Sequence, residues 1–182
     1  MWPLGHAAVG YLLYSLSARA RFGGRLATLP TVALLVGTQA PDLVDKPLAW
    51  YAGVLPTGRS LGHSLLVVVP ICLAVYWLAR RRGRAELGVA FGIGAVSHPL
   101  VDSVPALWSG TEVNYLLYPV VPVTEYEEGA PTLADLLAGS LGEPWFLLEF
   151  ALAGAALLAW HRDGRPGLGT VERVLRRATR ST

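Results

Sequence analysis

The chain of 182 residues is 53% hydrophobic and only 15% charged, and its formal net charge is +2. Soluble domains are about 25% charged, so these values argue against an ordinary soluble enzyme, a disordered chain and a basic module that binds nucleic acid. A small membrane protein or a very apolar helical domain remains. The single cysteine, Cys72, excludes an intrachain disulfide.

Five stretches with almost no charge predict five membrane helices, at about residues 2–18, 26–40, 63–79, 86–103 and 145–161. At 1.5 Å per residue each stretch nearly crosses a hydrocarbon core of about 30 Å. A soluble bundle of buried helices is the alternative. Residues 64–79 argue against it, because they are apolar all round. The first helix lacks the basic start of a signal peptide, and we expect it to stay in the mature protein.

Arginines orient these helices. Most basic residues fall in three clusters: Arg19, Arg21 and Arg25; Arg80, Arg81, Arg82 and Arg84; and Arg162, Arg165, Arg173, Arg176, Arg177 and Arg180. The positive-inside rule places all three in the cytoplasm, and the helices then alternate in direction. The net charge becomes about +10 inside and about −8 outside. We expect a membrane-embedded domain at residues 1–162 and a basic cytoplasmic tail at residues 163–182.

Two long outer loops follow from this arrangement, at residues 42–62 and 103–143. The second contains PTLADLLAGSL, which predicts a short helix with Thr132 as its N-cap. Tryptophans near the expected helix ends are typical of the two interfaces of a membrane.

The same orientation brings three histidines and three aspartates to the outer ends of four different helices: His6, His63, His98, Asp42, Asp45 and Asp102. His98 and Asp102 are four residues apart, so a helix places both on one face. Imidazole and carboxylate ligands suit zinc or a similar divalent ion. For each residue alone, a hydrogen bond between helices or a turn is the alternative. His161, beside Arg162, is expected to be a solvated interface residue.

The ordered motifs GHAAVGY, GTQAPDLVD, GRSLGHSLL and SHPLVDS resemble the YdjM-like family of inner-membrane-associated, metal-dependent hydrolases, also described as LexA-binding. The resemblance covers roughly residues 1–105. That family is distantly similar to zinc-dependent phospholipase C and P1-type nucleases, so the resemblance implies a related all-α fold, here a polytopic membrane bundle. It implies one or two zinc ions, or another divalent metal, held by His6, Asp42, His63, His98 and Asp102.

The motifs also depart from the phospholipase pattern. Those enzymes use a processed N-terminal tryptophan as a ligand, whereas Trp2 here follows Met1. They have further His and Glu ligands, but this chain has no histidine between residues 99 and 160. Glu149, or an acid among Glu125, Glu127 and Glu128, is the candidate for an extra ligand.

We therefore expect a multi-pass protein of the cytoplasmic membrane that is a metal-dependent hydrolase with its site on the outer face. Its expected partners are membrane lipids and a phosphoester, with a phospholipid head group as one substrate class, and no nucleic acid. Asp42 or Asp45 is the candidate general base, and the other would bind the metal or orient a histidine. Arg59, with Lys46, is the candidate phosphate-binding residue. The alternative function is a non-catalytic scaffold or regulator that binds a protein partner and has a structural metal.

Overall fold

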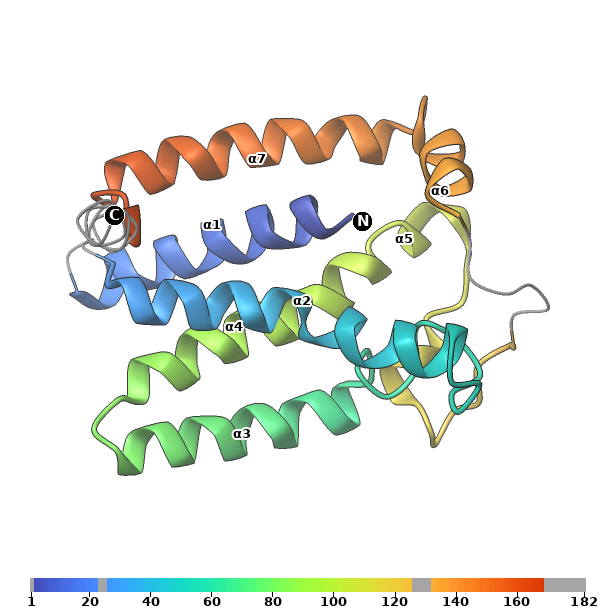
Figure 1. Ribbon diagram of the computed structural model, residues 1–182, viewed down its shortest axis with the longest axis horizontal. Coiled ribbons are helices and arrows are strands. Elements are labelled where there is room, and N and C mark those ends of the chain that lie inside the picture. Colours follow the sequence, from blue (N-terminus) through green and yellow to red (C-terminus); the bar gives the residue numbers. More distant parts are fainter. Residues whose placement is uncertain (1, 23–25, 126–131, 169–182) are drawn as a thin grey trace, which may run out of the picture.

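The computed structural model describes residues 2–22, 26–125 and 132–168, and this part of the chain is all-helical without a strand. Five long helices lie side by side and alternate in direction: α1 (Pro3–Phe22), α2 (Thr28–Trp50), α3 (Leu65–Arg81), α4 (Ala85–Ser103) and α7 (Pro144–Arg162) (Figure 1). Helix α4 is central and packs against α1, α2 and α3, whereas α7 packs against α1. The predicted all-α fold is confirmed.

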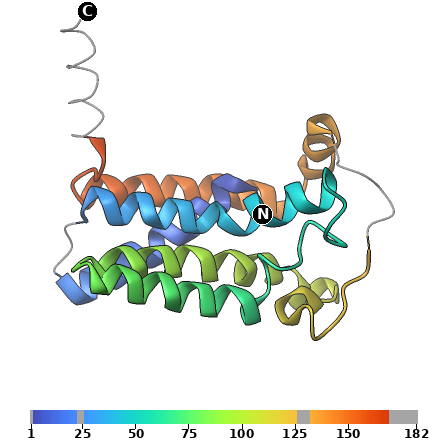
Figure 2. The same ribbon diagram turned by 60° about the horizontal axis from the view of Figure 1, so that its bottom comes forward.

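Three short helices lie together at one end of the bundle: α5 (Ala106–Ser109), η1 (Asn114–Leu117) and α6 (Leu133–Ser140) (Figures 1 and 2). The helix predicted within the second outer loop is α6. Its N-cap is Thr132, whose side chain accepts a hydrogen bond from the backbone of Asp135, and the Asp135 side chain accepts one from Thr132 in return. This reciprocal pair is a capping box, and it confirms the predicted helix start.

Helix α2 is longer than predicted. Its expected end was residue 40, but the helix continues through Pro41 and Pro47 to Trp50. A proline removes one backbone hydrogen bond and bends a helix without always ending it, and α2 changes direction along its length (Figure 1). The placement of Asp42 and Asp45 in a loop beyond the helix is therefore wrong: both lie on the second half of α2.

Two glycines bring the backbones of α2 and α4 into contact. A Cβ on Gly37 would collide with the carbonyl oxygen of Phe91, and one on Gly94 would collide with that of Leu34. Small residues allow this close approach between apolar helices. The contact matters for function, because it holds the end of α4 that carries His98 against α2.

Gly94→Ala is expected to weaken this contact, because the added methyl group meets backbone that cannot turn aside. Overpacking of this kind costs about 1–3 kcal/mol, and the melting temperature of the detergent-purified protein should fall by several degrees. Gly92→Ala is the matched control on the same helix, since a Cβ there meets only Cys72 at 3.7 Å. Equal melting temperatures for the two variants would contradict the role given to Gly94.

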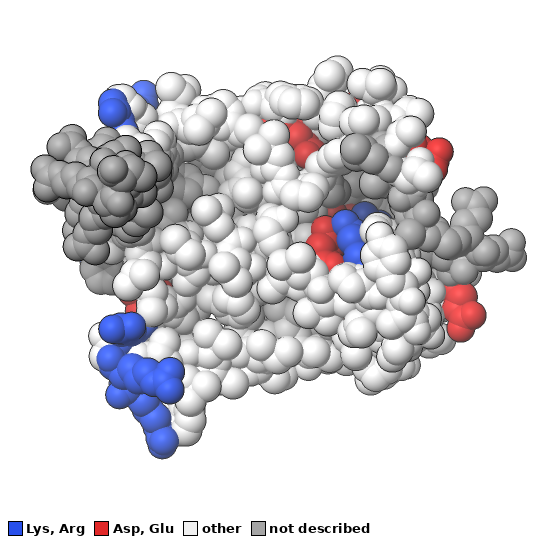
Figure 3. All heavy atoms as spheres, viewed as in Figure 1, with Lys and Arg blue, Asp and Glu red and all other residues white. Residues whose placement is uncertain are grey.

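The described helices include two that could cross a membrane by length and composition, Ala85–Ser109 and Pro144–Arg162. The sequence predicted five. Large apolar side chains are nevertheless exposed along the bundle, among them Leu147, Phe150 and Leu157 on α7. On the face that Figure 3 shows, most Lys and Arg side chains gather at one end, a smaller group meets acidic side chains away from that end, and the rest of the surface is largely uncharged.

Candidate metal centre

All six predicted histidines and aspartates meet between three helices, α1, α2 and α4, and the loop before α3. His6 comes from α1, Asp42 and Asp45 from α2, and His98 and Asp102 from α4; His63 precedes α3 by two residues. The cluster is buried: even the most exposed member, the Asp42 side chain, is only 11% exposed. Buried carboxylates are costly unless they are paired, so the contacts of each residue indicate its role.

Asp45 organises the loop that carries His63. Its carboxylate accepts backbone hydrogen bonds from Ser60 and Gly62, each at 2.7 Å, and from His63 at 3.2 Å. It also contacts Nδ1 of the His63 ring at 2.8 Å. Because this carboxylate acts as the acceptor in its three backbone contacts, Nδ1 of His63 is the donor in the fourth. The Nε2 atom is then left to bind a metal.

His98 is oriented in the same way by a backbone carbonyl. Its Nδ1 lies 2.6 Å from the carbonyl oxygen of Thr38, which can only accept, so this nitrogen also carries a proton. Thr38 lies on α2, three residues before Pro41. A backbone carbonyl of one helix thus fixes the orientation of a histidine on another.

The other ring nitrogens of His63 and His98 face each other, and both also face Asp42. Nε2 of His63 and Nε2 of His98 are 3.2 Å apart, and each is 3.6 Å from Oδ1 of Asp42. Ligands at about 2.0–2.1 Å from a tetrahedral zinc lie about 3.3 Å from one another. With both Nδ1 atoms acting as donors, the two Nε2 atoms need either a proton or a cation between them. The residues therefore fit a divalent cation at this point.

A second group of possible ligands adjoins the first, formed by His6, His98 and Asp102. The His6 ring stacks on His98 with centroids 3.7 Å apart, and its Nε2 lies 3.2 Å from Oδ1 of Asp102. Apart from this contact with Asp102, neither His6 nitrogen has a hydrogen-bond partner within the described part of the chain, although the side chain is 1% exposed. A buried imidazole in this state fits metal binding better than a structural role.

Two cations border the cluster on its open side. Lys46 Nζ binds Oδ2 of Asp42 at 2.6 Å, and Arg59 Nε binds Oδ2 of Asp102 at 2.9 Å. Both reach toward solvent, because their side chains are 34% and 42% exposed. Figure 3 shows acidic and basic side chains meeting in a hollow of this surface. The predicted phosphate-binding pair thus lies beside the cluster and is ion-paired to it.

The carboxylates favour positive charge at the centre of the cluster. Burial lowers the pKa of His63, but the carboxylates of Asp102 and Asp45 act in the opposite direction and hold it above its usual value. A metal cation that replaces the proton on the His63 ring is stabilised by the same two carboxylates. Metal binding is therefore expected to be coupled to proton release.

The extra ligands proposed from the sequence lie elsewhere. Glu149 is buried on α7, where it accepts a hydrogen bond from the backbone N–H of Trp2 at 2.8 Å. It is in neither group of possible ligands. Glu125 is exposed, and Glu127 and Glu128 lie outside the described residues.

Tyr115 is a neighbour of the site that the sequence analysis missed. It lies on η1 with its ring edge-on to His63 at 6.0 Å, and the Arg59 guanidinium lies 5.9 Å from the centre of the ring. The Ser64 hydroxyl donates to the carbonyl of Tyr118 at 2.5 Å and ties η1 to the start of α3. A lone tyrosine in a long loop has no spacing that marks it, so the sequence offered no signal.

A family model described as YdjM inner membrane protein matches residues 1–163 of the chain. No curated protein and no solved structure matches it, so the similarity to zinc phospholipase C and P1-type nucleases stays a prediction. The match includes every helix of the cluster and nearly the whole described bundle. The chain belongs to the YdjM inner membrane protein family.

Proposed function

We propose that this protein is a membrane-bound, metal-dependent hydrolase that acts on a phosphoester at the outer face of the cytoplasmic membrane. One observation carries the proposal: the meeting of His63, His98 and Asp42 at distances that suit a zinc ion, next to two half-exposed cations. The metal would supply Lewis acidity, which polarises a phosphoryl oxygen and activates water. A binding site for zinc and a binding site for phosphate would then be contiguous.

Each residue takes a role from its contacts. His63, His98 and Asp42 are the metal ligands, and His6 with Asp102 would hold a second ion. Asp42 is also the candidate base, because it belongs to the ligand group and its side chain is the least buried of the three. Asp45 is the orienting group, since both its oxygens already accept hydrogen bonds.

The proposed topology has all five long helices crossing the membrane with the cluster on the outer side. It is supported by their alternating directions, their exposed apolar side chains and the gathering of Lys and Arg at one end (Figures 1 and 3). Positive residues favour the cytoplasmic side. The test is cysteine labelling from outside intact cells, which should modify a cysteine placed at Val54 and spare one placed at Gly83.

The hydrolase proposal is tested with purified protein that has been stripped of metal and reloaded with zinc. We expect hydrolysis of a chromogenic phosphodiester, or of phosphatidylglycerol in mixed micelles, only after zinc is restored. Zinc-loaded protein with one equivalent of tightly bound metal and no turnover of either compound would instead support the structural metal site. The complete burial of the His63 and His98 side chains favours that second function.

Arg59→Gln is expected to raise KM for the phosphoester by about 10-fold or more, because one charge-assisted contact is worth about 1.5–3 kcal/mol. Arg59→Lys should recover part of the loss, since it keeps the charge without the planar fork. Zinc content serves as the check that the cluster survives. Arg80→Gln, at the opposite end of the bundle, is the control and should leave KM unchanged; a similar effect of both variants would contradict a phosphate contact at Arg59.

A further inference from the structure

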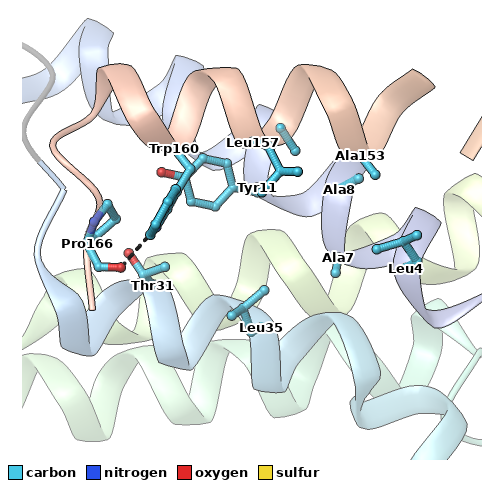
Figure 4. A pocket seen from close by; sticks show the side chains of 11 residues that line it. Leu4, Ala7, Ala8, Tyr11, Thr31, Leu35, Ala153, Leu157, Trp160 and Pro166 are labelled. Atoms are coloured by element: carbon cyan, nitrogen blue, oxygen red, sulfur yellow. Dashed lines mark hydrogen bonds between the residues drawn. The ribbon is translucent and has the colours of Figure 1, made fainter. Parts of the chain in front are cut away.

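A cavity lies away from the metal centre, between α1, α2 and α7 (Figure 4). Its volume is about 320 Å³. Apolar side chains form most of its walls, among them Leu4, Ala7, Leu35, Ala153 and Leu157. The proposed reaction gives this groove no role.

The few polar groups of the groove are already satisfied by the protein. Tyr11 donates to the Asp163 carboxylate at 3.1 Å, Thr31 donates to the Ala27 carbonyl at 3.0 Å, and the Trp160 indole donates to the Pro166 carbonyl at 3.1 Å. A polar ligand or a water molecule would find little to bind there, because it needs two or more free polar partners. The groove is therefore suited to hydrocarbon.

The direction and length of the groove fit one lipid chain. It follows α1 from Leu4 to Tyr11 and α7 from Ala153 to Trp160, which is about 10 Å at 1.5 Å per residue. One leaflet of a hydrocarbon core of about 30 Å is about 15 Å deep. Leu157 is 64% exposed at the rim, so the groove opens sideways onto the apolar surface of a membrane protein.

We propose that this groove binds one acyl chain of a membrane phospholipid. Trp160 and Pro166 lie at one end of the groove and Leu4 lies at the other (Figure 4). Binding of the chain in this groove does not depend on the proposed hydrolase function.

The test uses the full chain in lipid nanodiscs that contain phosphatidylglycerol with a photoactivatable diazirine in its acyl chain. We expect crosslinks on peptides that line the groove, from α1, α2 and α7. Ala153→Phe fills the groove and should reduce this labelling at least fivefold. Ala155→Phe adds the same side chain to the exposed face of α7, outside the groove lining, and should leave the labelling unchanged.

Equal labelling in the two variants would overturn the proposal, because it would reflect ordinary lipid around the bundle. Loss of groove labelling together with a change in oligomeric state would also overturn it, since a second copy would then be the occupant. Zinc content and melting temperature of Ala153→Phe are measured alongside and should match those of Ala155→Phe. Groove labelling without any hydrolysis would retain the acyl-chain site and count against the hydrolase proposal alone.

Discussion

Replacing His98 with alanine is expected to abolish tight zinc binding. His98 Nε2 faces both His63 and Asp42, and the same residue belongs to both groups of possible ligands. Its loss removes a nitrogen ligand from each group. Mutation of a residue that only orients a ligand lowers metal affinity by about 10–100-fold. We expect the zinc affinity of His98→Ala to fall by more than this. Zinc affinity is measured by competition with a chromogenic chelator, and zinc content by elemental analysis.

His161→Ala is the matched control for this experiment. It removes a histidine from the exposed end of α7, where His161 accepts a hydrogen bond from Arg165 at 3.1 Å. Zinc binding should be unchanged in this variant, and the helix content of both variants should equal that of the parent protein. A His98→Ala protein that keeps the zinc stoichiometry and affinity of the parent would reject the proposed site.

The sequence predicted the residues of the cluster better than its surroundings. Arginine placement alone put His6, His63 and His98 at one end of the helices, and the structure brings all three together. Helical spacing placed Asp102 one turn from His98 on α4, as observed. Such patterns survive because charge and helical periodicity are local properties of the chain.

The surroundings depend on contacts that local patterns do not encode. Pro41 and Pro47 read as helix-ending residues, yet α2 continues past both because α4 and the His63 loop pack against it. The hydrogen bond from His98 goes to the carbonyl of Thr38, a group that every residue has. Tyr115 reaches His63 from 52 positions further along the chain. Each of these features is a tertiary contact between distant segments.

Asp45→Asn is expected to destabilise the protein even in the absence of zinc. The asparagine keeps one acceptor oxygen, but its NH2 group replaces the other. That NH2 group would face N–H donors, among them those of Ser60 and His63, whose hydrogen bonds the Asp45 carboxylate accepts in the parent protein. Hydrogen bonds to a charged group contribute about 1.5–3 kcal/mol each, and leaving buried donors unpaired adds to the loss. The melting temperature of the zinc-free protein should therefore fall clearly.

Zinc affinity should also fall in Asp45→Asn, by about 10–100-fold, because His63 loses the acceptor that fixes its protonated nitrogen.

Asp42→Asn separates the effect on stability from the effect on zinc binding. Asp42 binds Lys46 and faces the histidines but receives no backbone hydrogen bond within the described residues, so its loss should weaken zinc binding while the zinc-free protein keeps its melting temperature. An Asp45→Asn protein as stable as Asp42→Asn without zinc would show that the loop holds its shape by other contacts. A lower melting temperature for zinc-free Asp45→Asn than for zinc-free Asp42→Asn would mean that the His63 loop is already folded without the metal, as expected for a site that binds a cation without refolding.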